Sequence, residues 1–197
     1  MVELVEFQRL VEIINILRSP AGCPWDREQS HLSVRDSLLE ECYEVLGAID
    51  AHNMKDLQEE LGDLLMQVVF HARIAEENGY FTIEEVIAGI VGKLLRRHPH
   101  VFGDLDVTDS AKVLRQWEEI KKEERADGVS MLDGVPITMP ALAFSQEIQG
   151  RAARVGFDWV EDDGIMEKLT EEIDELKKAE NDREKEEELG DIFFTLV

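Results

Sequence analysis

The sequence predicts an all-α protein with two tandem helical domains, the second of them incomplete. Apolar side chains recur at the spacing of an amphipathic helix over most of the 197 residues. Alternating apolar and polar runs rich in β-branched residues, which would indicate strands, are nearly absent. Two acidic segments also occur in the same order in both halves of the chain.

Helical periodicity and end signals place five helices in the first part of the chain. They are expected at residues 3–18, 33–51, 55–77, 82–97 and 109–126. Thr82 and Glu85 form a capping box at the start of the fourth helix, and Ser33 with Asp36 approximates one at the start of the second. Pro99 ends the fourth helix.

Residues 127–140 contain clustered glycine and proline and are predicted to be a linker. The predicted domains are therefore residues 1–126 and 141–197, and the second begins with a helix over about 140–155. The chain stops within an apolar helical stretch at Val197, with no counterpart of the fourth and fifth helices. We therefore expect this domain to be the N-terminal part of a longer copy.

An internal repeat supports this division. LEECYEV at 39–45 is echoed by TEEIDEL at 170–176, and EELGDL at 59–64 is echoed by EELGDI at 187–192. Two ordered matches at similar spacing favour a tandem duplication over coincidence.

The charge balance restricts the partners. The chain has 44 acidic against 21 basic residues, a formal net charge of −23, which disfavours nucleic acid and anionic membranes. No apolar run is long enough to span a bilayer, and the N-terminus lacks a signal-peptide pattern, so a cytoplasmic location is expected. A phosphorylated substrate would need metal ions and a confined basic cluster.

Two pairs of acids meet this requirement. Glu41 and Glu44 share one face of the second helix, and Glu60 and Asp63 share one face of the third. A short turn makes these helices an antiparallel hairpin, so the four carboxylates should converge. Since crowded carboxylates raise one another's pKa, a dication would relieve the conflict. All-oxygen ligation favours Mg²⁺, with Mn²⁺ as a substitute, over Zn²⁺.

The ordinary alternative is that these acids form solvated helix faces. Against it, Glu60 faces Leu64 and Asp63 faces Gln67 at the i+4 positions, and neither has the basic partner that a solvated helix uses. A di-iron site is disfavoured because the one Glu-x-x-His pair, Glu28 and His31, precedes the second helix.

A basic cluster follows the acids. Lys93 and Arg97 share a face of the fourth helix, and Trp117 and Lys121 share a face of the fifth. This set suits a polyphosphate held by charge-assisted hydrogen bonds. A favourable helix C-terminus with a core tryptophan explains the same residues equally well.

Together these residues resemble the MazG family. The resemblance rests on the EExxE and ExxD acids at 40–44 and 60–63, and on CPWD at 23–26, FHA at 70–72 and RRHPHVF at 96–102. It spans essentially the whole chain. The acid motif is also found in related all-α pyrophosphatases such as the dimeric dUTPases, and the other segments favour MazG.

The resemblance implies a dimeric helical bundle that uses Mg²⁺ to hydrolyse nucleoside triphosphates to the monophosphate and pyrophosphate, with broad base tolerance. The implied metal ligands are Glu41, Glu44, Glu60 and Asp63, with Glu172, Glu175, Glu188 and Asp191 as their equivalents in the second copy. The implied nucleotide contacts are Lys93, Arg97, Trp117 and Lys121. Glu40 is the candidate general base; Glu41, Lys93 and Arg97 complete the catalytic set.

Two other readings stay open. One is a pyrophosphatase for dUTP or for damaged nucleotides, because carboxylates and Mg²⁺ recognise phosphate and not the base. The other is a non-enzymatic helical module that binds a partner protein. A homodimer is also expected from apolar residues on more than one face of the third helix, namely Leu65, Met66, Val69 and Phe70.

Overall fold

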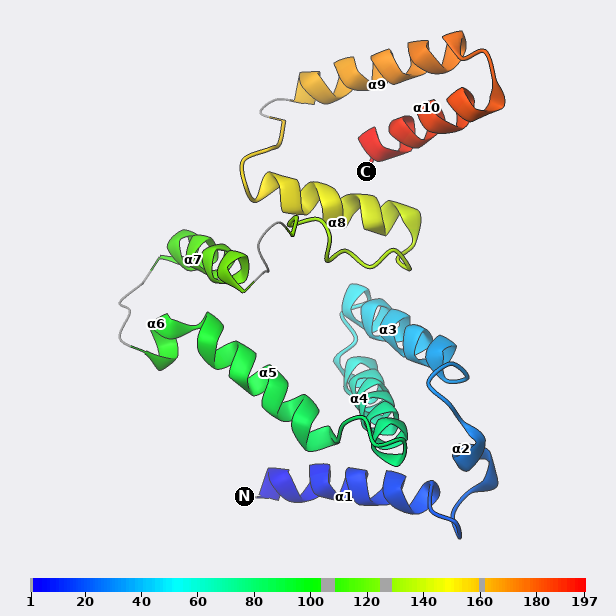
Figure 1. Ribbon diagram of the computed structural model, residues 1–197, viewed down its shortest axis with the longest axis vertical. Helices are drawn as coiled ribbons and strands as arrows, with labels where there is room; N and C mark the ends of the chain where they lie inside the picture. The colour runs from blue at the N-terminus through cyan, green and yellow to red at the C-terminus, as the bar shows by residue number, and fades with distance from the viewer. Residues whose placement is uncertain (1, 104–108, 125–128, 160–161) are drawn as a thin grey trace. The chain divides into compact units, whose positions relative to one another are not determined.

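The computed structural model describes residues 2–103, 109–124, 129–159 and 162–197, and all regular structure in these ranges is helical (Figure 1). The all-α prediction is confirmed, whereas the tandem duplication stays a prediction. Contacts divide the chain into two compact units, Met1–Thr108 and Asp109–Val197. This division precedes the predicted linker, so the helix expected at 109–126 groups with the second unit; the predicted domain limits stay a prediction.

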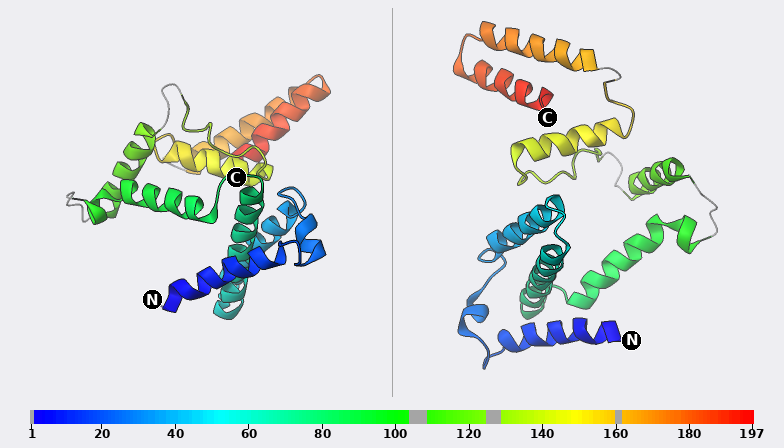
Figure 2. Two further views of the ribbon diagram at one scale, coloured as in Figure 1. Left: turned by 60° about the horizontal axis from the view of Figure 1, so that its bottom comes forward. Right: turned by 180° about the vertical axis from the view of Figure 1, so that it is seen from behind.

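The first unit contains six helices within its described residues. They are α1 (Val2–Leu17), α2 (Pro24–Glu28), α3 (Arg35–Asp50), α4 (Met54–Glu77), α5 (Ile83–Arg97) and α6 (Pro99–Phe102). The five-residue α2 and the four-residue α6 were not predicted. Helices α3 and α4 lie side by side as a hairpin, and both turned views of the chain agree on this (Figure 2).

The ends of these helices follow from local side-chain chemistry. The Asn53 side chain accepts hydrogen bonds from two backbone N–H groups at the start of α4. The capping box of Thr82 and Glu85 is confirmed at the start of α5. The predicted box at Ser33 is wrong: Val34 is the N-cap, because the Ser33 hydroxyl is held by Gln29 and the backbone of residue 30.

The core of the first unit forms around the C-terminal half of α4. Val69, Phe70 and Ile74 of α4 are buried against Ile14 of α1 and against Val34. Helix α1 therefore packs on the far half of α4, and the N-terminal half is left to face α3.

A buried arginine fixes the chain after α1 to the end of α4. The Arg18 guanidinium donates to the Glu77 carboxylate at 2.7 Å, and also to the carbonyl oxygens of Asp26 and Gln29. Arg73, one turn before Glu77, donates to the same carboxylate. Arg18 thus ties the end of α1 to the α2 segment and, through Glu77, to α4.

The second unit contains α7 (Ser110–Glu123), α8 (Ala141–Ala153), α9 (Asp162–Lys178) and α10 (Asp182–Thr195). Helices α9 and α10 form a second hairpin, with Asn181 capping α10. Helix α8 contacts α10, where the Gln149 side-chain amide donates to the carbonyl oxygen of Phe194. Among the described residues, no helix is long and apolar enough to cross a membrane.

Candidate active site

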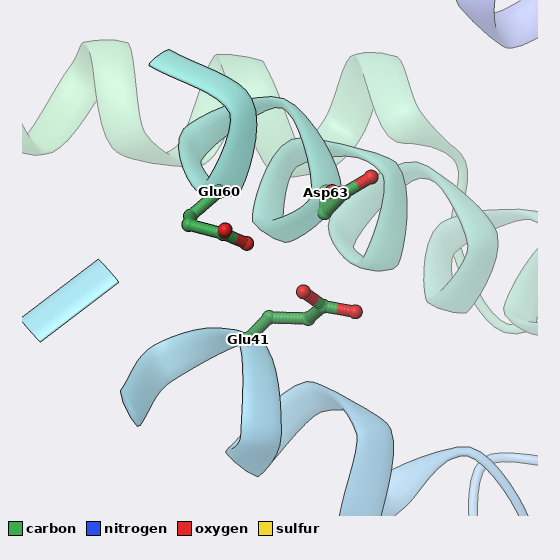
Figure 3. Close-up of side chains that lie close together, drawn as sticks. All are labelled: Glu41, Glu60 and Asp63. Atoms are coloured by element: carbon green, nitrogen blue, oxygen red, sulfur yellow. The ribbon is translucent and has the colours of Figure 1, made fainter. Parts of the chain in front are cut away.

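Three carboxylates converge between α3 and α4. Glu41 projects from α3 toward Glu60 and Asp63 of α4, and one oxygen from each lies within 4.8 Å of the others (Figure 3). Glu60 and Asp63 share a face because three residues cover most of one helical turn. Three of the four carboxylates predicted to converge are therefore close together, and we call them the first acidic group.

The surroundings of the first acidic group disfavour ionisation. Burial, followed by the charges of nearby acids, raises the pKa of Glu60. The pKa of Glu41 is raised by burial and by Asp63 and Glu44, although a hydrogen bond from Gln67 acts in the opposite direction. A cation bound among these oxygens would favour their ionised forms. The donor set, made of oxygens alone, fits a hard dication such as Mg²⁺.

Glu44 and Glu40 lie outside the three-carboxylate group. Glu44 is exposed on α3, yet its charge raises the pKa of both Glu41 and Glu60, so it lies beside the group. Glu40 is also exposed on α3. Their roles as metal ligand and as general base stay predictions.

The predicted basic residues are divided between the two units. Lys93 is exposed and Arg97 half-buried on α5, in the same unit as the first acidic group. Trp117 and Lys121 belong to α7 of the second unit, where the ammonium lies 4.2 Å from the centroid of the indole ring. Their i, i+4 spacing places them on one face of α7 and allows this cation–π contact. A common nucleotide site for all four residues stays a prediction.

The second unit holds a matching set of acids. Glu172 of α9 and Glu188 and Asp191 of α10 have ligand oxygens within 4.8 Å of one another, and we call them the second acidic group. Burial, and next the charge of Glu175, raises the pKa of Glu188. Glu175 is exposed beside this group, as Glu44 is beside the first.

Comparison with known proteins extends the likeness beyond the acids. The profile of the MazG nucleotide pyrophosphohydrolase domain matches residues 29–102, which include the whole first acidic group. A Thermotoga maritima protein named nucleoside triphosphate pyrophosphohydrolase/pyrophosphatase MazG is 50% identical over 192 residues, covering 97% of this chain and 74% of that protein. The chain belongs to the MazG family.

Further MazG relatives agree. The nucleoside triphosphate pyrophosphohydrolase of Escherichia coli K12 is 48% identical over 200 residues, covering 98% of this chain and 76% of that protein. The crystal structure of a MazG-related protein from Thermotoga maritima matches with a TM-score of 0.50 and 30% identity, over 58% of this chain and 98% of that one. The predicted enzyme class, a hydrolase acting on phosphoanhydrides, is confirmed by these relatives.

Within this MazG chain, Gln67 is a site residue that the sequence did not identify. It is buried on α4, one turn beyond Asp63, and its hydrogen bond to Glu41 lowers the pKa of that acid. The available signal was its i+4 spacing from Asp63, which indicates a shared face.

A histidine pair continues the same face of α4. His71 lies one turn beyond Gln67, and its Nδ1 is 2.9 Å from Nδ1 of His31, with the rings stacked. Burial and the neighbouring His31 lower the pKa of His71. A hydrogen bond between two ring nitrogens requires one of them to be unprotonated, so at least one imidazole is neutral.

Proposed function

We propose that this chain hydrolyses nucleoside triphosphates to the monophosphate and pyrophosphate in an Mg²⁺-dependent reaction at the first acidic group. The observation that carries the proposal is the convergence of Glu41, Glu60 and Asp63 from two facing helices. It is supported by relatives at about half identity that are named nucleoside triphosphate pyrophosphohydrolases. Mn²⁺, which accepts the same oxygen ligands, is the expected substitute.

The acidic side chains at this site would have separate roles in metal binding and in proton transfer. Glu41, Glu60 and Asp63 would hold the ion, with Glu44 completing the set once the ion draws the carboxylates together. The ion would neutralise charge on the phosphate oxygens and activate water for attack on phosphorus. Glu40 would accept the proton of that water, a role that suits its exposed position next to Glu41.

The basic residues would hold the polyphosphate. Lys93 and Arg97 are one turn apart on α5 and would donate charge-assisted hydrogen bonds to phosphate oxygens. Trp117 would stack on the base and Lys121 would add a further positive charge. These contacts would be made to the phosphates and to the flat face of the base, which all nucleotides have, so we propose broad base tolerance.

The second candidate function is a pyrophosphatase restricted to dUTP or to a damaged nucleotide. Hydrolysis rates measured across the NTPs and dNTPs separate the two, because a restricted enzyme would prefer one substrate by orders of magnitude. The non-enzymatic module is not retained, since the family is one of hydrolases.

The test is a product analysis with one nucleotide. Incubation of the chain with ATP and Mg²⁺ should yield AMP and pyrophosphate, whereas ADP and phosphate would refute the proposal. Asp63→Asn should reduce kcat/KM roughly a hundredfold or more, since a metal ligand positioned for the transition state is lost. It should also remove the Mg²⁺-induced rise in melting temperature. Asp56→Asn, at an exposed acid on the same helix, should retain both.

A further inference from the structure

The histidine pair joins the segment before α3 to α4. His31 lies between α2 and α3, and its Nδ1 is 2.9 Å from Nδ1 of His71 on α4. The chain on either side of His31 is held separately, because Arg18 donates to the carbonyl oxygen of Gln29 and Val34 is buried in the core. Among the described residues, the histidine contact is therefore the hydrogen bond that holds residues 30–33 on α4.

This contact depends on the number of protons that the two rings carry. A ring nitrogen accepts a hydrogen bond only while it is unprotonated, so the contact requires one neutral imidazole. If both rings are protonated, two N–H groups and two positive charges face each other across the same short distance. The contact then changes from attractive to repulsive.

The surroundings of His71 disfavour its protonation in place. Its Nε2 is a buried atom without a hydrogen-bond partner among the described residues. A protonated His71 would therefore carry a buried N–H group without an acceptor, which is costly. Burial, followed by the neighbouring His31, lowers the pKa of His71. Protonation of both rings consequently favours an arrangement in which His71 reaches water.

The charges on the elements packed against α4 do not replace His31 in this role. The charged side chains that the structure describes on α1 and α3 are exposed, apart from Glu41, and so are Glu84 and Glu85 at the start of α5. Among the described residues, His31 is the charged group that shifts the pKa of His71. The nearby charged groups with printed partners are Arg18 and Arg73, which both donate to Glu77, and Glu41, which is hydrogen-bonded to Gln67.

We propose that His31 and His71 form a proton-operated latch, which holds the segment before α3 on α4 at neutral pH and releases it when both rings are protonated. The latch lies at the entry to the helix that carries Glu41, and it needs neither metal nor substrate. The pKa of His71 is lowered from its usual value of 6.5, so the released form binds more protons than the closed form at acid pH. The stability that the latch contributes is present above pH 6.5 and is lost as the pH falls through the folded-state pKa of His71.

The test follows hydrogen exchange in the full chain by mass spectrometry. The amides of Ser30, Ser33 and Val34 are hydrogen-bonded within the latched segment, so their protection reports its release. Protection, expressed relative to an unstructured chain to correct for pH, should fall several-fold from about pH 7.5 to about pH 5.5, on either side of the ordinary range for histidine. Val69 and Phe70 in the core should keep theirs.

His71→Gln separates the latch from other effects of acid. A glutamine amide offers both a donor and an acceptor, so it can pair with His31 in either protonation state, and the fall in protection should disappear. His31→Gln, at an exposed position, removes the repulsion from the other side and should reduce the fall. The matched control is His52→Gln in the exposed turn between α3 and α4, which should retain the full fall.

The carboxylates of the first acidic group are the same in every variant, so their own protonation cancels in the comparison. Melting temperatures near neutral pH establish that each variant is folded. Protection of residues 30–34 that does not change with pH in the unsubstituted chain overturns the latch. An equal fall in both His71→Gln and His31→Gln also overturns it.

Discussion

Glu41 experiences opposing influences from its neighbours. Burial and the acids Asp63 and Glu44 raise its pKa, while the buried Gln67 amide donates to it and lowers its pKa. A ligand carboxylate that is hydrogen-bonded by a fixed neighbour is already oriented before the metal arrives. We therefore expect Gln67 to position Glu41 for an ion.

The first prediction follows from this contact. Gln67→Leu removes the donor but keeps a similar volume, so the helix pair should still fold while Glu41 loses its anchor. We expect Mg²⁺ affinity to fall about tenfold, as is usual when the partner of a metal ligand is removed. Calorimetric titration measures this, and Gln58→Leu, at an exposed position of α4, is the control. Equal affinity in the two variants would show that Gln67 has no positioning role.

At the residue scale, spacing alone predicted the acids but not their neighbours. The i, i+3 pattern placed Glu60 and Asp63 on one face and the short turn brought Glu41 opposite them, as the structure has it. Gln67 was missed because its contact with Glu41 depends on burial, which the sequence pattern does not report.

Helix α4 carries two tasks along its length. Its N-terminal half presents Glu60 and Asp63 toward α3, and its C-terminal half packs on α1. The far end is fixed by Arg18, whose side chain is 4% exposed, through the Glu77 carboxylate. The rigidity of this end should keep the acid-bearing half in register with α3.

The second prediction concerns the pH dependence of this contact. Hydrogen bonds from Arg18 are the main cause that lowers the pKa of Glu77 from its usual value of 4.5. A carboxylate with a lowered folded-state pKa contributes stability above its unfolded-state pKa and loses it as the pH falls through the folded-state value. Glu77→Gln should therefore reduce the free energy of unfolding by about 2 kcal/mol at neutral pH, a value typical of hydrogen bonds to charged groups.

The measurement is urea denaturation as a function of pH. The difference between the chain and Glu77→Gln should be largest near neutrality and should shrink as the pH falls below 4.5. Glu76→Gln is the control, because Glu76 is 46% exposed and, in the described part of the chain, its ion pair is with Arg73. A difference that does not change with pH would mean that Glu77 acts through packing and not through charge.

At the element scale, long helices were predictable and short ones were not. Helices α1, α4 and α5 begin and end within about two residues of their predicted limits, since several turns establish a period. Helices α2 and α6 have five and four residues, too few to establish one. Ser33 shows a second reason why helix starts are hard to predict. Its hydroxyl donates to the Gln29 side chain instead of capping the helix, and a capping motif in the sequence does not indicate which local partner a hydroxyl will take.

The third prediction concerns the assembly, which we expect to be a homodimer. The sequence predicted a dimer from apolar residues of α4, but Val69 and Phe70 of that helix are buried in the core of their own unit. Exposed apolar side chains that could form an interface lie on α5, where Val86, Ile90 and Leu94 are spaced one turn apart and are 37–47% exposed. Contiguous apolar surface of this kind is typical of a protein interface.

Ile90→Glu tests this expectation. A charge in the middle of a buried apolar interface is costly, so the variant should be monomeric at micromolar concentration. Light scattering should give twice the 22.5 kDa chain mass for the unsubstituted chain and the single mass for the variant. Ala88→Glu, at an exposed position on the opposite side of α5, should stay dimeric. A monomeric unsubstituted chain would contradict the prediction.

The last prediction concerns which of the two units carries the hydrolytic activity. The MazG profile matches residues 29–102, and this segment contains the first acidic group together with Lys93 and Arg97. The second acidic group lies outside that match, and its Glu172 is paired with the Lys168 ammonium. We therefore expect the first group to turn over substrate in this chain.

Two matched substitutions decide between the groups. Glu60→Gln and Glu188→Gln each neutralise one acid at the same place in the ExxD pattern. Glu60→Gln should reduce kcat/KM for ATP roughly a hundredfold or more, because a positioned charge is lost from the transition state, whereas Glu188→Gln should keep most of it. Melting temperatures of both variants control for unfolding. Activity that survives Glu60→Gln but not Glu188→Gln would move the catalytic centre to the second unit.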